Sequence, residues 1–333
     1  MPRRVIGAAL VALVVAGSSA ATGQAQAEPV VLHVPGDVHL VTVLDGSSYT
    51  VAHTIRHANG SWDGFGTLGL GQFLQMTSTI VNGEEHLLHD FRNNHPPQYD
   101  WIVDRIRHAD GTWSETSSPA VAGGIALELA APAVSGEMHV VRRSVADPAV
   151  RHHVRHADGT WSDLPTLPAP AALEGSVAVA GYGGELRLLY IGPDLATVSY
   201  YTAQADGVWS TAVQVPFDPP APGVTPSAVE AAQVGTDLHA VVRGSDGLLY
   251  HAKRDVNGAW TRFWPIGSQT PVPPNVSSVS ITAASGVLHV AVSAGGGLYH
   301  SIRLATGAWQ PFGDVLGEAG RWVRARAVSI AGD

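Results

Sequence analysis

Short apolar segments separated by polar turns run along most of the chain, and the same arrangement recurs about every 50 residues. In the last copy the apolar segments lie at 278–284, 288–293, 298–304 and 308–312. Each segment is short, rich in β-branched or aromatic residues and bounded by glycine or polar residues, which is typical of a strand. Almost no segment carries apolar residues at the helical spacing over a useful length. The pattern therefore predicts an all-β protein built from a four-stranded unit.

A Gly-x-Trp motif occurs once in each unit and defines the length of the repeat. The Trp-to-Trp steps are 51, 48, 48, 51 and 49 residues. In five of the six copies the glycine follows Asp or Asn, as in a tight hairpin turn. Six such units predict a six-bladed β-propeller in which each Trp is a blade-packing residue. The motifs are Gly60/Trp62, Gly111/Trp113, Gly159/Trp161, Gly207/Trp209, Gly258/Trp260 and Gly307/Trp309.

The two ends of the repeat region predict how the ring closes. Segment 322–333 resembles a seventh first strand, although only six sets of the other three strands are present. We expect this C-terminal strand to complete the first blade, which removes open sheet edges. Closure by the N-terminal strand and a seven-bladed ring are the alternatives. The predicted boundaries are 1–27 for a signal peptide, 28–333 for one propeller domain with repeats near 28–65, 66–116, 117–166, 167–215, 216–267 and 268–315, and 316–333 for the closing strand.

The first residues have the three parts of a secretory signal peptide. Arg3 and Arg4 precede an apolar run at 5–17, and Ala25-Gln26-Ala27 forms a small-x-small cleavage site. The run is shorter than the roughly 18–20 residues of a membrane span. We therefore expect secretion by the Sec route, with the twin-arginine route as the alternative, and no membrane insertion. The sequence does not indicate whether the protein forms oligomers.

Composition narrows the classes of chemistry. The formal net charge is −9, only 14% of residues are charged, and 45% are hydrophobic. This acidic balance argues against nucleic-acid binding, which needs a basic face. The chain has no cysteine, which excludes thiol nucleophiles and cysteine-ligated metals, and its one lysine, Lys253, disfavours Schiff-base and P-loop chemistry. Neither Gly-x-Ser-x-Gly nor His-Glu-x-x-His occurs.

The third strand of four units carries His-x-x-Arg, and a Trp follows six residues after each of these arginines. Arg and His donate hydrogen bonds to hydroxyl groups and an indole stacks on apolar surface, so these residues are candidates for binding a small polar ligand. Alternatively, they are packing residues between blades, and an offset of three on a strand puts His and Arg on opposite faces. The candidates are His53, Arg56, Trp62, His152, Arg155, Trp161, His251, Arg254, Trp260, His300, Arg303 and Trp309.

The unit around Trp113 carries an inserted loop at 89–101. Aromatic residues on such a loop are typical of ligand contact, so Tyr99 and Trp101 join the candidates. The alternative is a lid that packs over a neighbouring blade. The densest histidine run, 151–156, alternates between the two faces of a strand, and we expect no metal site and no cofactor.

The pattern Leu-His-Val … Leu-Tyr-His-x-x-Arg … Gly-x-Trp, seen best at 238–260 and 288–309, resembles secreted propeller lectins. These are the fungal-type fucose lectins, the Photorhabdus-type lectins and the tachylectin-2/tectonin group. The resemblance covers essentially 28–333. It implies that mono- or oligosaccharides bind in pockets between adjacent blades, through Arg, an acidic or amide residue and an aromatic residue. It also implies that the four His/Arg/Trp sets above are site residues.

These observations lead to three hypotheses of different classes. The first is a secreted, non-catalytic, carbohydrate-binding propeller with several interblade sites, whose partner is a saccharide or glycoconjugate. The second is a secreted glycoside hydrolase or lyase. It predicts that residues that break the repeat, such as those at 89–101 or near Tyr200 and Tyr201, converge at one mouth of the channel, where paired carboxylates are also expected. The third is a protein-binding scaffold, which predicts a broad apolar or charged patch on the rim.

Overall fold

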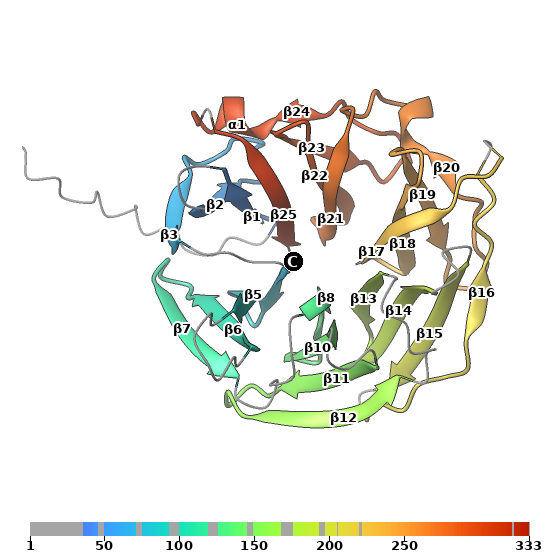
Figure 1. The fold of residues 1–333 in the computed structure, drawn as a ribbon, viewed down its shortest axis with the longest axis horizontal. Helices are drawn as coiled ribbons and strands as arrows, with labels where there is room; N and C mark the ends of the chain where they lie inside the picture. Colours follow the sequence, from blue (N-terminus) through green and yellow to red (C-terminus); the bar gives the residue numbers. More distant parts are fainter. Residues whose placement is uncertain are drawn as a thin grey trace, which may run out of the picture.

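The described part of the chain forms six antiparallel sheets that surround a central axis like the blades of a propeller (Figure 1). The computed structural model describes residues 36–45, 50–70, 75–92, 100–118, 126–144, 149–167, 176–192, 197–204, 206–219, 222–321 and 323–332. The repeat spacing predicted this six-bladed β-propeller correctly. The predicted signal peptide, residues 1–27, lies outside the described residues.

Each blade contributes four antiparallel strands, of which the first lies nearest the ring axis and the last at the rim. Blade 1 contains β25 (Ala325–Gly332), β1 (Val38–Leu44), β2 (Thr50–Arg56) and β3 (Gly66–Leu70). Blade 2 contains β4 (Met76–Val81), β5 (Glu84–Arg92), β6 (Asp100–Arg107) and β7 (Trp113–Ser118). Blade 3 contains β8 (Ala126–Ala130), β10 (Glu137–Ser144), β11 (Val150–Arg155) and β12 (Trp161–Leu167), and the short β9 (Ala133–Val134) also pairs with β10.

The second half of the ring repeats this plan. Blade 4 contains β13 (Val177–Tyr182), β14 (Glu185–Ile191), β15 (Val198–Gln204) and β16 (Val213–Val215). Blade 5 contains β17 (Pro226–Val234), β18 (Asp237–Gly244), β19 (Leu249–Arg254) and β20 (Trp264–Pro265), followed by the 3-10 helix η2 (Ile266–Ser268). Blade 6 contains β21 (Val276–Ala284), β22 (Val287–Ala294), β23 (Gly297–Arg303) and β24 (Gly313–Asp314), followed by α1 (Val315–Glu318).

The C-terminal strand closes the ring, as the sequence predicted. β25 pairs antiparallel with β1, from Val38 opposite Gly332 to Leu44 opposite Ala325. In Figure 1, β25 (red) lies beside β1 (blue), and the C-terminus lies near the axis. Because the two ends of the chain share one sheet, the first blade is completed by the last strand and its inner edge is covered.

The glycine of each Gly-x-Trp motif is required for two reasons. All six of these glycines have φ between +76° and +93°, a region that side chains with a Cβ rarely adopt. A Cβ at Gly258 would lie 2.8 Å from Nη2 of Arg254, and one at Gly307 would lie 3.1 Å from Nη2 of Arg303. The motif therefore makes a tight turn and leaves room for the guanidinium of the preceding strand.

The hydrophobic core is divided among the interfaces between blades. Each of the six core clusters combines residues of two neighbouring blades, as where Leu189 of blade 4 packs with Leu238 of blade 5. Each cluster is also covered by one half-buried Trp from a Gly-x-Trp motif, for example Trp309 at the interface of blades 5 and 6. Packing between blades therefore holds the ring together, because the described chain has one such core for each interface.

The innermost strands surround a central channel. The cavity along the axis has a volume of about 280 Å³ and is lined by β4, β9, β13, β17, β21 and β25 among other residues. No helix in the described part of the chain is long and apolar enough to cross a membrane.

Candidate functional site

The histidine after each Arg in the Arg-His-Ala repeats holds a hairpin together. Nδ1 of His156 lies 2.7 Å from Oε1 of Glu137 at the start of β10, and Nε2 lies 2.9 Å from Oγ of Ser162 on β12. His108 makes the equivalent contacts with Glu84 and Ser114. These histidines link three strands of one blade. They recur in the repeats because they stabilise the hairpin turn.

A second set of histidines forms buried pairs within four blades. In each pair, Nδ1 of a histidine on the second strand lies 2.9–3.2 Å from Nε2 of a histidine on the third strand. Between two neutral rings, such a contact is a hydrogen bond in which one nitrogen carries the proton and the other accepts it. The pairs are His39/His53, His139/His152, His239/His251 and His289/His300.

Burial lowers the pKa of most of these paired histidines. It is the main cause that lowers the pKa of His152 to about 3, with smaller contributions from His139 and His153. Burial and then the nearby Arg303 lower the pKa of His239 to about 4. Burial and then Arg56 lower the pKa of His289 to about 4. The rings of His152, His239 and His289 are therefore neutral at pH 7, and each offers one donor and one acceptor nitrogen.

The Trp that contacts the third-strand histidine comes from the next blade in chain order. The ring of Trp309 in blade 6 lies edge-on to His251 in blade 5, with centroids 5.5 Å apart. Trp62 in blade 1 lies edge-on to His300 in blade 6 at 5.4 Å, and Trp113 in blade 2 to His53 in blade 1 at 5.4 Å. The same relation joins His152 to Trp209 and Tyr200 to Trp260.

The arginine reaches the same interface as its Trp because the two are direct cross-strand partners. Arg303 is bridged to Trp309, and Arg56 to Trp62. In agreement, Arg303 lowers the pKa of His239 and His251 in the preceding blade, and Arg56 lowers that of His289 and His300. Each interface thus combines a histidine pair from one blade with an Arg and a Trp from the next.

In the structure, the candidate histidines His251 and His300 each lie with the candidate Arg and Trp of the next repeat around the ring. The His and the Arg of one repeat lie on opposite faces of their strand and serve different interfaces, so one repeat does not form a site alone. His300 meets Arg56 and Trp62, whereas Arg303 and Trp309 meet His251. Several residues that complete these groups were not among the saccharide-binding candidates, although the alignment of the repeats contains them. They are His39, His86, Asp104, Arg107, Trp113, His139, Tyr200, Trp209, His239 and His289.

At the interface of blades 2 and 3, a carboxylate replaces the third-strand histidine. Oδ2 of Asp104 lies 3.0 Å from Nδ1 of His86 in its own blade and 3.0 Å from Nε of Arg155 in the next. Asp104 is 1% exposed. Trp161 packs on the hydrophobic cluster of this interface. An arginine, a carboxylate and an aromatic residue thus converge at this junction.

The two interfaces of blade 4 depart from the pattern in different ways. Between blades 4 and 5, the guanidinium of Arg254 lies 4.8 Å above the ring of Tyr200, beside Trp260. Between blades 3 and 4, the arginine position is occupied by the buried Ala203. The latter interface therefore has a Trp and a histidine pair but no arginine at the repeated position.

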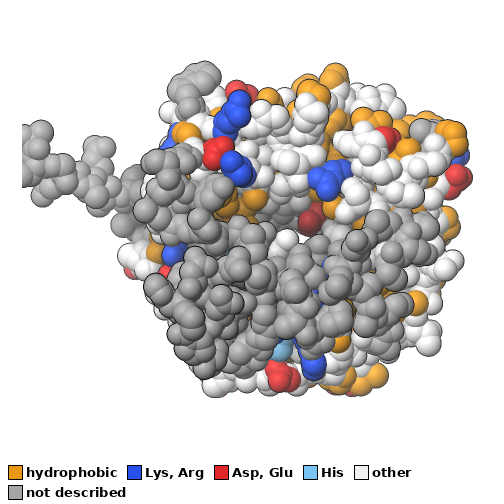
Figure 2. All heavy atoms as spheres, in the orientation of Figure 1, with side chains coloured by type: hydrophobic (Ala, Val, Ile, Leu, Met, Phe, Trp, Pro, Cys, Tyr) orange, Lys and Arg blue, Asp and Glu red, His pale blue; other side chains and the backbone are white. Residues whose placement is uncertain are grey.

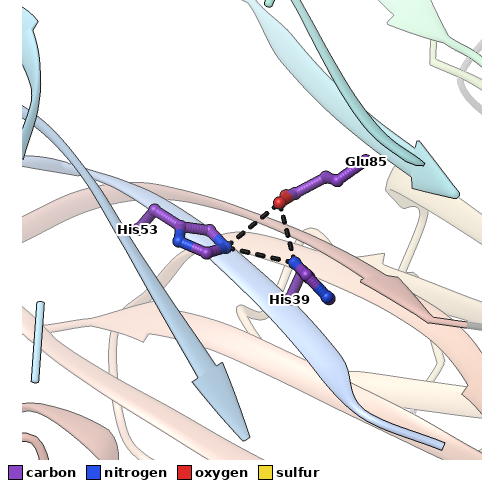
Figure 3. A group of neighbouring side chains, drawn as sticks. All are labelled: His39, His53 and Glu85. Carbon is purple, nitrogen blue, oxygen red and sulfur yellow. Dashed lines mark hydrogen bonds and ion pairs between the residues drawn. The ribbon is translucent and has the colours of Figure 1, made fainter. Parts of the chain in front are cut away.

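At the interface of blades 1 and 2, a glutamate joins the histidine pair (Figure 3). Oε2 of Glu85 lies 2.8 Å from Nδ1 of His39 and 3.0 Å from Nε2 of His53. Burial would raise the pKa of Glu85, but the two histidines outweigh it and hold the pKa well below its usual range. The carboxyl group is therefore ionised although it is 1% exposed.

The remaining candidates lie elsewhere. Tyr99 is outside the described residues, and Trp101 lies on β6, with its side chain outside what the structure describes. The histidines of the run 151–156 have three separate sets of partners: His152 contacts His139, His153 contacts Asp163, and His156 contacts Glu137 and Ser162.

The described lining of the central channel bears on the hydrolase hypothesis. Among the described side chains that line it, Glu230 is the only carboxylate. Tyr200 lies at the interface of blades 4 and 5, and Tyr201 is buried in the core between blades 3 and 4. Within the described residues, the expected convergence of paired carboxylates and these tyrosines at the channel is therefore not found.

Charges on the described surface form no single patch on the face shown in Figure 2. Acidic and basic side chains on that face lie in small groups that contain both signs, with uncharged surface between them. The large hydrophobic residues that are exposed lie on outer strands or hairpin turns of blades 4 and 5. Among the described residues these are Val208, Val213, Leu248, Val256 and Trp264.

Comparison with known proteins supports the fold. No protein-family model and no curated protein matches the sequence. The structure is similar to solved lectin propellers. A variant of the Aleuria aurantia lectin in complex with Fucα1-6GlcNAc has a TM-score of 0.57 and 13% identity, over 83% of this chain and 91% of the lectin. A crystal structure of that lectin is described as a six-bladed β-propeller with a novel mode of fucose recognition.

Two further solved structures show the same likeness. The BP39L lectin of Burkholderia pseudomallei has a TM-score of 0.57 and 15% identity, over 85% of this chain and 81% of the lectin. The SapL1 lectin in complex with α-methyl fucoside has a TM-score of 0.57 and 14% identity, over 86% of this chain and 98% of the lectin. At these identities the comparison establishes the fold, a six-bladed propeller of the kind found in fucose-binding lectins.

Proposed function

We propose that the protein is a carbohydrate-binding propeller that holds saccharides at the interfaces between blades without catalysis. The observation that carries this proposal is the repeated meeting of an Arg and a half-buried Trp from one blade with polar groups of the preceding blade. Five of the six interfaces have both the Arg and the Trp. Two of the solved structures that share the fold are lectins in complex with fucosides, which adds support for a sugar as the ligand.

The chemistry of the interface fits a sugar. A guanidinium presents several N–H donors in a fixed plane, which suits the vicinal oxygens of a saccharide. The indole is partly exposed and offers apolar surface to the C–H face of the ring. The histidine pair or Asp104 lies largely buried behind them, and Asp104 is ion-paired with Arg155 at 3.0 Å.

The interface of blades 5 and 6 is the clearest example. Arg303 and Trp309 are cross-strand partners, and they face the buried pair His239 and His251. All members of this site lie in the described ranges. We therefore choose it for the substitutions that test the proposal.

The test is a glycan array probed with the purified protein, followed by titration with the free saccharide of the best glycan. We expect binding that the free saccharide inhibits, because the site recognises the sugar itself. Arg303→Gln and Trp309→Ala should each weaken or remove one of several sites. Absence of binding to every glycan at high micromolar protein would overturn the proposal.

Two control variants separate binding from general damage. Arg262→Gln makes the same change at an exposed arginine of blade 5 that pairs with Asp218 outside the interface. Trp264→Ala makes the same change as Trp309→Ala at an exposed Trp on β20 that belongs to none of the interblade groups. Both should leave saccharide affinity unchanged, whereas equal losses in all four variants would show that the losses are not due to the proposed sites.

We further propose that the protein acts outside the cytoplasm. The support is the pattern of the first 27 residues, with basic Arg3 and Arg4, an apolar run and the Ala25-Gln26-Ala27 site. N-terminal sequencing of protein collected from the medium of the native host should begin near Glu28. Full-length protein confined to the cytoplasm would contradict this proposal.

A further inference from the structure

The interface of blades 1 and 2 carries a side-chain group that none of the other histidine pairs has. Glu85 stands directly before the second-strand histidine of its blade and opposite Arg107 on β6. At the same register position the other five blades have buried hydrophobic residues. These are Val38, Met138, Leu186, Leu238 and Leu288.

Glu85 therefore places a buried carboxylate at a position where the other five blades have a hydrophobic core residue. The hydrophobic cluster at this interface, built on Val41, Val51 and Leu87, is the smallest of the six found among the described residues. A buried carboxylate at a core position costs free energy unless a cation or several donors compensate it. A requirement for a carboxylate at this one interface would explain why it departs from the repeat.

Three possible ligand atoms meet at one point in this group. Nδ1 of His39, Nε2 of His53 and Oε2 of Glu85 lie 2.8, 3.0 and 3.2 Å apart in pairs. Figure 3 shows the two rings, from the adjacent strands β1 and β2, both directed toward the carboxylate from β5. Ligands that bind one ion at about 2.1 Å lie roughly 2.9–3.4 Å apart in octahedral or tetrahedral geometry. Shifts of a few tenths of an ångström would bring the atoms into that range.

Hydrogen bonds alone do not satisfy all three contacts among these atoms. A neutral imidazole has one N–H, so if both rings are neutral and donate to Glu85, the contact of 3.2 Å between His39 and His53 joins two donors. If one ring donates to the other instead, a lone pair faces the carboxylate. A single cation at the centre interacts favourably with all three atoms. In the other histidine pairs there is only one contact, and one proton satisfies it.

We propose that His39, His53 and Glu85 form a binding site for one divalent transition-metal ion of the zinc class. Two imidazoles and a carboxylate are the donor set that such ions take, with a remaining position for water or a second carboxylate oxygen. Oε1 of Glu85 has no hydrogen-bond partner among the described residues and is available for that position. The bound ion links blade 1 to blade 2 where the hydrophobic contact is smallest.

Arg107 limits the expected affinity. It is buried at the same interface, opposite Glu85, so a bound dication lies beside a guanidinium. Like charges in a buried setting repel, and we therefore expect a dissociation constant of about micromolar rather than that of a dedicated structural zinc site.

The test measures zinc directly on the purified full-length chain. After treatment with a chelator and dialysis, the protein is equilibrated overnight with Zn²⁺ because the three side chains are buried. Competition with a chromophoric chelator gives the affinity, and elemental analysis gives the stoichiometry. We expect one bound zinc per chain. Glu85→Gln and His53→Gln should each weaken it at least tenfold.

His251→Gln is the matched control, since it removes one ring from a pair that has no carboxylate, and its zinc affinity should equal that of the native chain. Glu85→Leu is a second variant that should fold, because Leu occupies this position in three other blades. Zinc should raise the melting temperature of the native protein and not that of Glu85→Leu. Binding weaker than about 100 µM, or equal affinity in Glu85→Gln, would overturn the proposal.

Discussion

At the scale of single residues, buried polar groups define the differences between the interfaces. Asp104 accepts from His86 in its own blade and pairs with Arg155 in the next, at 3.0 Å in both cases. Its equivalents in four other blades are the histidines that join a second ring. The same position therefore holds either a neutral pair or an ion pair, and the neighbouring blade supplies an arginine in most cases.

Asp104→Ala tests how much the ion pair between Asp104 and Arg155 contributes to the free energy of unfolding. It leaves the Arg155 charge and the His86 ring largely buried without their partner, and we expect a loss of about 3–5 kcal/mol in the free energy of unfolding. Asp104→His restores the residue used in four other repeats, and should lose clearly less. Urea unfolding measures both. Equal losses for the two variants would contradict the role assigned to the carboxylate.

The sequence allowed only some of these buried polar contacts to be predicted. The alignment of the repeats shows where Asp104 and Tyr200 replace a histidine, and the period of the strand shows that His and Arg of one repeat face opposite sides. The contact between His39 and Glu85 joins residues from different repeats, 46 positions apart. It depends on how two blades pack, which no local pattern contains.

At the scale of elements, the hairpin between the third and fourth strands organises each interface. Its glycine turns the chain, its Trp covers the core between two blades, and its closeness to the arginine fixes where the guanidinium lies. The spacing of this one hairpin was sufficient to predict six blades, because each blade contains it once. The hairpin spacing does not show which residues of neighbouring blades contact each other. Those contacts follow from how the blades pack in the ring.

Gly258→Ala should damage this hairpin in two ways. Gly258 has φ of +88°, and the added Cβ would meet Nη2 of Arg254 at 2.8 Å. We expect the free energy of unfolding to fall by about 1–2 kcal/mol. Gly267→Ala in the same blade is the control, since nothing lies within 4 Å of its added Cβ. Urea midpoints that do not differ between the two variants would contradict this explanation of the motif.

At the scale of the whole molecule, the ring is held by its interfaces and closed by β25. The predicted closing strand is confirmed, because β25 pairs with β1 and the first and last blades share one core cluster. Stability should therefore depend on groups that repeat around the ring, among which the buried histidines are prominent.

The buried histidines predict that acid destabilises the protein. The pKa is about 3 for His152 and about 4 for His239 and His289, whereas an unfolded histidine has its pKa near 6.5. As the pH falls from about 6.5 to 4, the unfolded chain binds protons that the folded chain does not. Between pH 7 and pH 5 each such histidine should remove about 1–2 kcal/mol.

Melting temperatures at pH 7 and pH 5 measure this effect, with His289→Gln as the comparison. The native protein should melt at a clearly lower temperature at pH 5, and His289→Gln should lose less on acidification because it has one buried ring fewer. A melting temperature that is unchanged or higher at pH 5 would contradict the prediction.

The proposal that saccharides bind between the blades is tested most directly by counting them. Calorimetric titration of the protein with the free saccharide of its best glycan gives the number of sites per chain. We expect more than one site, and we expect Trp309→Ala to reduce that number by one while the affinity of the remaining sites is retained. A single site that is insensitive to substitution of Trp309, Arg303, Trp62 and Arg56 would contradict the interblade account.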